Sequence, residues 1–255
     1  MPLEIVTVHC LSDNYAFLAH DPETGRTAVV DVPEASPILA ALDDRGWSAD
    51  VVLLTHHHAD HVQGLDAIRA RFAPRVVGAA QDAHRLPPLD QQVREGDTVE
   101  IGSEQGTVIE VPGHTVGHIA FHFPESRAAF TADSLMALGC GRVFEGTMEQ
   151  MWQSLSKLAA LPPETLICSG HEYTLANGNF ARSVEPGNPR LISRIEESKK
   201  ARAEGRPTVP SALSLELETN PFLRPDSPEI RSNVGLPDAS AAEVFAALRA
   251  RKDNF

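Results

Sequence analysis

The sequence has no apolar run that approaches the roughly 20 residues needed to cross a bilayer, and it has only three cysteines. Cys10, Cys140 and Cys168 lie far apart in the chain. An odd, dispersed set argues against a disulfide framework and fits a reducing compartment. The first residues carry no basic segment of the secretory type, so we expect a cytoplasmic protein. With 42% hydrophobic residues, the chain supports a full core in one large domain or two smaller ones.

Positive charge is scarce as well. The chain has 22 Lys and Arg against 35 Asp and Glu, for a net charge of −13, which argues against nucleic acid as a partner. The deficit is uneven, because residues 180–255 contain 12 basic and 11 acidic residues. Two interpretations remain open: chance variation in composition, or a C-terminal part that supplies cations for an anionic small ligand.

What the sequence does contain is organised around residues 51–61, Val-Val-Leu-Leu-Thr-His-His-His-Ala-Asp-His. The four apolar residues predict a short buried strand. Imidazoles and the carboxylate of Asp60 follow directly, and these are the ligands that a borderline divalent metal prefers. In a tight turn His56 and His58 share one side. We therefore expect His57 to point away from them and not to bind metal.

Three further candidate ligands follow predicted strands in the same way. His114 follows residues 108–111, Asp133 follows residues 128–132, and His171 follows residues 165–168. One histidine after a strand is weak evidence, but several such junctions together predict ligands that converge on one rim of the fold.

The pattern of apolar residues and turn residues predicts two sheets packed face to face with helices outside. From about residue 173 the strands stop, and we expect a smaller helical domain whose last two helices are connected by loops rich in Pro and Asn. We predict strands at residues 3–9, 15–19, 27–32, 51–54, 75–79, 98–101, 106–111, 119–123, 128–131 and 165–168, and helices at residues 37–45, 65–72, 148–161, 188–204 and 239–251.

The histidine motif and the three later ligands resemble those of the metallo-β-lactamase-fold hydrolases. Other segments resemble glyoxalase II, the hydroxyacylglutathione hydrolase family, over nearly the whole chain. The histidine motif is specific only to the superfamily, whereas the Gly-Cys-Gly segment and the helical C-terminal part indicate the family. The segments that carry the family resemblance are Ser12-Asp13-Asn14-Tyr15, Thr131-Ala132-Asp133, Gly139-Cys140-Gly141-Arg142, Phe144-Glu145-Gly146-Thr147, Gly170-His171-Glu172-Tyr173, Val184-Glu185-Pro186-Gly187-Asn188 and Arg249-x-x-Lys252-Asp253.

The resemblance implies an α/β fold: a metallo-β-lactamase-like αββα sandwich in residues 1–173, followed by a small all-α domain in residues 174–255 that contributes to glutathione binding. It also implies two divalent metal ions, with Zn expected and Fe or Mn accepted by the same ligand types. Metal 1 would be bound by His56, His58 and His114, metal 2 by Asp60, His61 and His171, and Asp133 would bridge them.

The implied reaction is hydrolysis of S-(2-hydroxyacyl)glutathione, such as S-D-lactoylglutathione, to glutathione and a 2-hydroxy acid in methylglyoxal detoxification. A hydroxide held between the metals would attack the thioester, with Asp60 and Asp133 as catalytic residues. The leaving thiolate needs no general acid, since a thiol has a pKa of about 8.5. Cys140 has no neighbour in sequence that would activate it, so we do not expect a nucleophile there.

The same resemblance assigns glutathione binding to Arg142, Phe144, Tyr173, Arg249 and Lys252. Arg142 stands where the family commonly has lysine, and Phe144 stands where it often has tyrosine. For Arg249 and Lys252 an ordinary charged helix end, favoured by the helix dipole, is the alternative. We expect a monomer that acts on a small-molecule glutathione thioester and binds neither nucleic acid nor membrane.

Other functions share the histidine motif. They are an iron-dependent persulfide dioxygenase, another hydrolase of the fold such as a lactonase or β-lactamase, and a non-catalytic metal-stabilised module that binds a thiol. The roughly 80 residues after Tyr173 count against the dioxygenase. The complete ligand set counts against a module that has lost catalysis.

Overall fold

The computed structural model describes all 255 residues, which form two compact units. The first unit comprises Met1–Glu110 and Val116–Ala132, and the second comprises Val111–Thr115 and Asp133–Phe255. The short segment that contains His114 therefore belongs with the C-terminal part of the chain.

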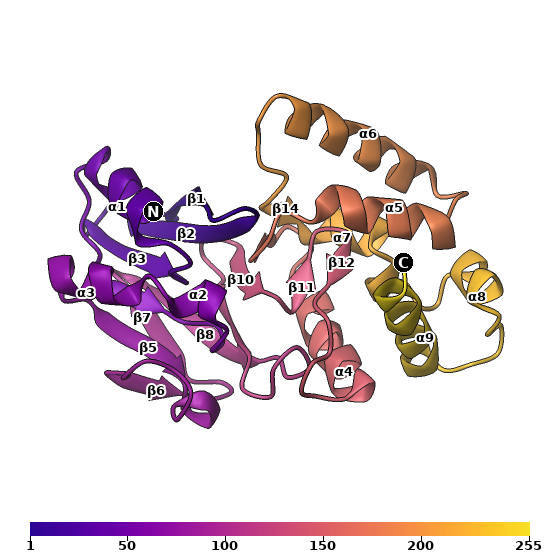
Figure 1. The fold of residues 1–255 in the computed structure, drawn as a ribbon, viewed down its shortest axis with the longest axis horizontal. Helices are drawn as coiled ribbons and strands as arrows, with labels where there is room; N and C mark the ends of the chain where they lie inside the picture. Colours follow the sequence, from indigo (N-terminus) through magenta and orange to yellow (C-terminus); the bar gives the residue numbers. More distant parts are fainter. The chain divides into compact units, whose positions relative to one another are not determined.

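The first unit contains a mixed six-stranded sheet with the strand order β1-β2-β3-β4-β5-β6 (Figure 1). β1 to β3 pair antiparallel, whereas β3 to β6 pair parallel. The turn at residues 21–25 joins β2 to β3, with Asp21 opposite Arg26. The strands are β1 (Glu4–Cys10), β2 (Asn14–Asp21), β3 (Arg26–Val30), β4 (Val51–Leu53), β5 (Arg75–Ala79) and β6 (Gln91–Val93).

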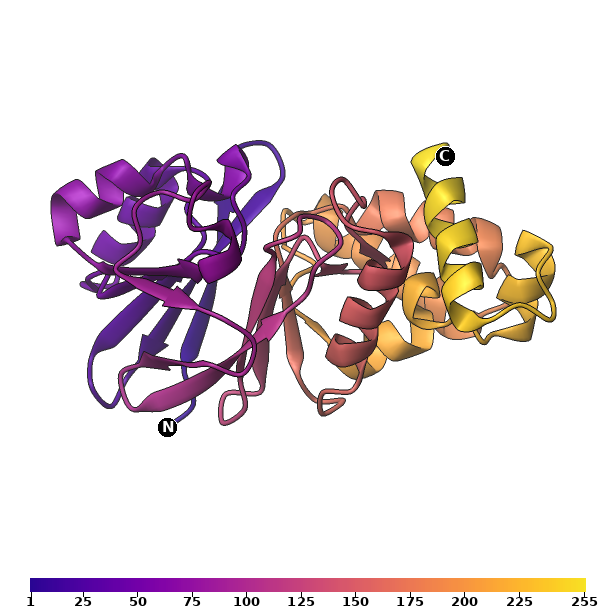
Figure 2. The ribbon, with the colours of Figure 1, turned by 90° about the horizontal axis from the view of Figure 1, so that it is seen from below.

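Four antiparallel strands of a second sheet complete the sandwich of this unit: β7 (Thr98–Ile101), β8 (Glu104–Glu110), β9 (Ile119–Phe123) and β10 (Ala128–Ala132). Phe17 of β2 and Phe130 of β10 have ring centroids 5.7 Å apart, so the core lies between the two sheets. Helices α1 (Ala35–Asp43), α2 (Ala59–Val62) and α3 (Leu65–Phe72), with the 3₁₀ turn η1 (Ala80–Asp82), complete the unit. The helices gather on one side of the first sheet (Figure 2).

The second unit begins with a small hairpin of β11 (Leu135–Met136) and β12 (Gly139–Cys140). Helix α4 (Met148–Ala159) follows, and a capping box between Thr147 and Gln150 fixes its start. β13 (Leu166–Ser169) pairs antiparallel with β14 (Ser211–Ala212). The remaining elements are α5 (Thr174–Val184), α6 (Pro189–Ala203), α7 (Leu213–Thr219), the 3₁₀ turn η2 (Pro221–Leu223), α8 (Pro228–Val234) and α9 (Ala241–Asp253).

The α/β sandwich followed by a helical C-terminal region confirms the predicted fold class, but several local predictions were wrong or incomplete. The sequence did not predict the short elements β6, β11, β12 and α2. The stretch between the last two predicted helices contains α7, η2, α8 and strand β14 rather than loops alone. Helix α5 was not predicted, because its sequence includes Asn177, Gly178 and Asn179, which are poor helix formers. Tertiary packing selects Gly178: a Cβ there would lie 3.0 Å from Cγ1 of Ile195 in α6. No helix combines the length and apolar character needed to span a bilayer.

Candidate metal centre

The histidine turn of the first unit begins where β4 ends, and a buried carboxylate from the neighbouring strand end fixes its start. Asp31 follows β3 and is 2% exposed. Its two oxygens accept hydrogen bonds from Thr55 N at 2.9 Å and Thr55 Oγ1 at 2.8 Å. Since β3 and β4 run parallel, their carboxyl ends meet at one edge of the sheet, and this edge presents the donor side chains.

His56 and His61 are fully buried, and each has a partner at Nδ1. Thr55 Oγ1 lies 3.0 Å from His56 Nδ1, and Asp31 Oδ2 lies 2.7 Å from His61 Nδ1. Metal-binding histidines characteristically have one ring nitrogen held in this way, which fixes the orientation of the ring. Ligand atoms of Asp31, His56 and His61 all lie within 4.8 Å of one another. The chemistry and support of this donor set fit a cation.

His58 and Asp60 complete the donors of this unit. His58 Nδ1 lies 3.1 Å from His56 Nε2, and Asp60 Oδ2 lies 3.8 Å from His61 Nε2. Asn14 Nδ2 donates to both the backbone oxygen and Oδ2 of Asp60, at 3.0 Å each. Asn14 therefore orients a carboxylate that is only partly buried.

His57 has a different environment from the donors on either side of it. Its Nδ1 lies 3.0 Å from Oδ2 of Asp82, in η1. This interaction agrees with the expectation that His57 points away from the ligands. His118 is buried and stacks on His56 with ring centroids 4.6 Å apart, so it packs against the histidine turn.

The second unit brings together the other three predicted ligands. Asp133 Oδ2 lies 3.4 Å from His114 Nε2 and 3.3 Å from His171 Nε2. All three side chains are buried. His114 Nδ1 lies 2.8 Å from the carbonyl oxygen of Arg142, so its ring has the same type of outer support as His56 and His61. One carboxylate oxygen thus faces two imidazoles from different segments.

The Gly-Cys-Gly segment gives the backbone the room it needs beside Asp133. A Cβ on Gly141 would overlap the carbonyl oxygen of Asp133, and a Cβ on Gly139 would overlap Nδ2 of Asn177. Burial raises the pKa of the Cys140 thiol to about 11, although nearby Arg249 acts in the opposite direction. At neutral pH this thiol stays protonated, so it is not a poised nucleophile.

Two exposed aromatic side chains flank the histidines of the second unit. Phe144 is 62% exposed, and its ring centroid lies 5.3 Å from that of His114. Tyr173 is 39% exposed and stacks on His171, with centroids 4.8 Å apart and planes 7° apart. Exposed aromatic rings beside buried donors suit the binding of a ligand.

Two predicted cations of the second unit share the carboxylate of Asp253, and a third, Lys252, lies within their electrostatic influence. Arg249 is buried, and it donates from Nη1 to the Cys140 carbonyl and from Nη2 to Asp253 Oδ1, at 2.9 Å each. Arg142 Nε lies 3.7 Å from the same Asp253 oxygen, and the Arg142 side chain is exposed. Burial, together with Arg249 and Arg142, lowers the pKa of Lys252. This grouping has an excess of positive charge in a strongly acidic chain.

Sequence reasoning missed Asp31, and it left open whether Asn14 lines the site or serves packing. The predicted strand at residues 27–32 includes Asp31, whereas in the structure β3 ends at Val30, directly before it. No local signal links Asn14 to Asp60, which is 46 residues away.

Comparison with known proteins places the chain in a family. Residues 16–171 match the model of the metallo-β-lactamase superfamily, and residues 172–255 match that of the hydroxyacylglutathione hydrolase C-terminus. Proteins named hydroxyacylglutathione hydrolase from Cereibacter sphaeroides and Ruegeria pomeroyi are each 65% identical over 255 residues, which cover 100% of both chains.

Solved structures show the same fold. ETHE1 from Myxococcus xanthus has a TM-score of 0.67 at 26% identity and covers 99% of this chain and 98% of its own. The BLEG-1 B3 metallo-β-lactamase has a TM-score of 0.68 at 18% identity and covers 87% of this chain and 100% of its own. The full-length relatives and the matched C-terminal model go further than the fold, and they show that this chain belongs to the hydroxyacylglutathione hydrolase (glyoxalase II) family of the metallo-β-lactamase superfamily.

Proposed function

We propose that the protein hydrolyses S-(2-hydroxyacyl)glutathione thioesters, such as S-D-lactoylglutathione, to glutathione and a 2-hydroxy acid, as a step in methylglyoxal detoxification. One observation carries the proposal. In residues 139–144 the Arg142 carbonyl supports the buried donor His114. The same segment exposes the Arg142 side chain and the Phe144 ring, which could contact a substrate. The names of the full-length relatives support the same activity.

The metal assignment remains as the family resemblance implies. Two divalent ions, preferably Zn, would be bound by His56, His58 and His114 and by Asp60, His61 and His171, with Asp133 as the bridge. A donor set of imidazoles and carboxylates supports this assignment, since Zn, Fe and Mn all accept such ligands. Two such ions would lower the pKa of a shared water and so supply hydroxide at neutral pH.

The residues around the donors orient and support them. Asp31 holds His61, Thr55 holds His56, and the Arg142 carbonyl holds His114. Asn14 fixes one oxygen of Asp60. We assign no general acid, because a thiolate with an unperturbed pKa of about 8.5 leaves without protonation.

For glutathione, we propose that Arg142 and Lys252 meet the glycine carboxylate and that Tyr173 and Phe144 flank the thioester. Arg249 supports these residues without touching glutathione, because its guanidinium is buried and hydrogen bonded to Cys140 and Asp253. A phenylalanine in place of the family's tyrosine removes a hydroxyl hydrogen bond, which costs about 0.5–1.5 kcal/mol of binding energy.

We also propose the functional division into residues 1–173 and 174–255, a monomeric state and a cytoplasmic location. The two family models meet at residues 171 and 172, which supports the division. All three cysteines are free and buried, which supports a reducing compartment.

The test combines metal content with thioester hydrolysis. Fully loaded protein should approach two metals per chain and hydrolyse S-D-lactoylglutathione, and chelation should abolish turnover. Asp133→Ala should lower both metal content and kcat/KM, by about 100-fold or more in the latter, whereas the matched control His57→Ala should retain both. Oxygen consumption with glutathione persulfide in place of thioester hydrolysis would sink the proposal. Full activity with one metal would remove the binuclear assignment.

A further inference from the structure

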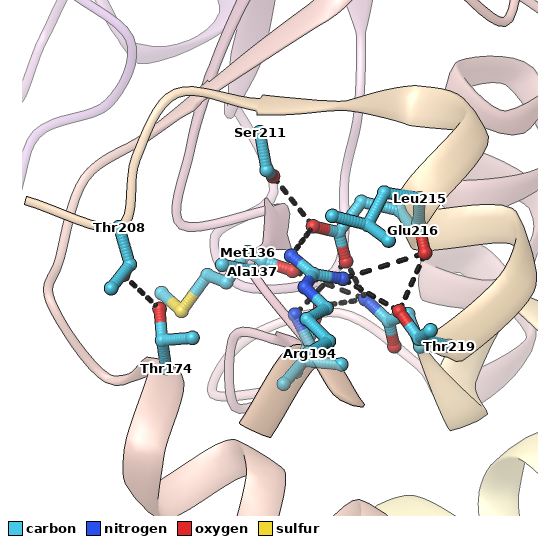
Figure 3. Close-up of polar contacts among 12 residues, drawn as sticks. Met136, Ala137, Thr174, Arg194, Thr208, Ser211, Leu215, Glu216 and Thr219 are labelled. Atoms are coloured by element: carbon cyan, nitrogen blue, oxygen red, sulfur yellow. Dashed lines mark hydrogen bonds and ion pairs between the residues drawn. The ribbon is translucent and has the colours of Figure 1, made fainter. Parts of the chain in front are cut away.

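A buried ion pair in the second unit lies outside the site described so far. Arg194 of α6 and Glu216 of α7 form the pair, with exposures of 4% and 0%. Glu216 Oε1 also accepts from Ser211 Oγ at 2.6 Å, and Arg194 Nη1 donates to Thr219 Oγ1 at 2.7 Å (Figure 3). Burying two charges is costly, and such a pair is weak evidence for stability. The further contacts of Glu216 indicate that the pair holds a neighbouring turn in place.

The second oxygen of Glu216 holds the turn of the β11–β12 hairpin. Oε2 accepts from the backbone N–H of Leu138 at 2.9 Å. Leu138 is fully buried and has φ +56, a left-handed conformation that a branched side chain adopts only when its surroundings impose it. Arg194 fixes the carboxylate so that Oε2 faces this N–H group.

Two asparagines hold the rest of the same turn. Asn220 Nδ2 donates to the carbonyl oxygens of Met136 and Gly139, at 3.1 and 2.9 Å. Asn177 Nδ2 donates to the carbonyl oxygen of Ala137 at 3.1 Å. Each of the four residues of the turn therefore has a backbone group bound by a side chain from the helical region.

The open end of this hairpin carries two residues of the proposed site. Asp133 lies just before β11, and Arg142 lies just after β12. Gly141 N donates to Ser134 O at 3.2 Å, which ties the two ends together. The Arg142 carbonyl in turn supports His114. A shift of the turn would therefore displace a metal ligand, the support of another ligand and a substrate-binding cation together.

We infer that Glu216 and Asn220 are positioning residues: they set the place of the β11–β12 hairpin, and through it the spacing of Asp133, His114 and Arg142. The inference rests on the proposed function for the roles of these three residues. Glu216 touches neither metal nor substrate, so its effect passes through the backbone of the turn.

The test compares Glu216→Gln with Glu185→Gln. Glu185 is a matched control, because it is buried, pairs with Arg224 and accepts further hydrogen bonds from Asn188 and Ser227, none of which belongs to the hairpin. The measurements are Co²⁺ affinity by chelator competition, the visible spectrum of the Co²⁺-loaded protein, kcat, KM and Tm, at a temperature where circular dichroism shows both variants folded.

Glu216→Gln should weaken Co²⁺ binding by about 10-fold, within the range for outer-shell partners of metal ligands, alter the spectrum and raise KM. Glu185→Gln should lower Tm alone. If both variants lower Tm and leave Co²⁺ affinity, spectrum and KM unchanged, the positioning role is overturned. If Glu216→Gln does not fold, Asn220→Ala, which removes two bonds to the turn without a change in charge, faces the same criteria. The Co²⁺ affinity and spectrum can be measured even if the parent protein hydrolyses no thioester. A failure of the proposed function is therefore distinguished from a failure of the positioning role.

Discussion

Arg249 and Lys252 lie one turn apart on α9 but have different surroundings. Both Nη groups of Arg249 are hydrogen bonded, and its guanidinium lies 5.1 Å from the Phe222 ring centroid. The Lys252 ammonium lies 5.6 Å from the Phe180 centroid and 5.4 Å from that of Phe255. The sequence places these two residues on one helix face, but their contacts differ. Arg249 is hydrogen bonded to other parts of the protein, whereas Lys252 contacts aromatic rings, and we propose it as a cation for the substrate.

At the residue scale, the lowered pKa of Lys252 predicts that affinity for a glutathione ligand depends on pH. Burial and the neighbouring Arg249 and Arg142 make Lys252 lose its proton below its usual 10.5. Affinity for S-hexylglutathione, a thioether that cannot be hydrolysed, should therefore fall as the pH rises toward 10.5. Lys252→Arg keeps its charge and should bind with a flatter pH profile, which titration calorimetry would show.

Titration of the ligand itself affects parent and variant alike, so the difference between their profiles is the measurement. Because folding lowers the pKa of Lys252, this group binds fewer protons in the folded state, and its own contribution to the free energy of unfolding rises with pH. Circular dichroism over the same pH range separates loss of binding from unfolding. Identical profiles for the two proteins would exclude Lys252 from the binding surface.

At the scale of elements, the β11–β12 hairpin connects the helical region to the proposed metal ligands Asp133 and His114. The side chains that hold its turn come from α5 and α7, and its two glycines allow close backbone approach. The signature segment is therefore explained by packing rather than by the chemistry of Cys140.

Gly141→Ala tests this explanation. The added Cβ would overlap Asp133 O and lie 3.0 Å from His114 Nδ1, so two proposed metal ligands must shift. We expect metal affinity to fall by about 10- to 100-fold, measured by chelator competition. Gly25→Ala is the control: its φ of +73 strains an alanine, but no atom lies within 4 Å of the added Cβ. It should cost about 1–2 kcal/mol of stability and leave metal affinity unchanged; an equal loss of affinity in both variants would contradict the explanation.

At the scale of the whole molecule, the negative charge opposes an anionic substrate. The net charge is −13, and glutathione thioesters are also negative at neutral pH. The grouping of Arg142, Arg249 and Lys252 around Asp253 provides local attraction that the bulk charge does not. Of these three cations, Arg142 has an exposed side chain, and the attraction between an exposed charge and a ligand is screened by salt, with a Debye length of about 10 Å at 0.1 M.

KM for S-D-lactoylglutathione should therefore rise with ionic strength while kcat changes little, because the affected contacts are remote from the thioester. Steady-state kinetics across a salt series would measure this effect. Arg142→Gln should raise KM at low salt and reduce its salt dependence. A thioester without the glycine carboxylate provides the control, and an equal salt effect on that substrate would remove the proposed carboxylate contact.

The sequence alone predicted the candidate donor histidines and carboxylates, and it identified most strands and the long helices. These features follow from local patterns: apolar runs that end in polar side chains, and Gly, Pro and Ser residues that separate strands. The family resemblance was also readable from short segments, because each keeps its own spacing within a few residues.

Only the tertiary structure decided what surrounds these residues. Asn14 and Asp60 are 46 residues apart, Leu138 and Glu216 are 78 apart, and Cys140 and Arg249 are 109 apart. Hydrogen bonds between residues so far apart produce no repeating pattern in a single sequence. Each partner, seen alone, looks like an ordinary polar residue. Helix α5 was missed for the same reason: its poor helix formers are selected by what they contact, Gly178 by Ile195 and Asn177 by Ala137. Local sequence patterns indicate the candidate donors, whereas long-range packing determines which residues support and orient them.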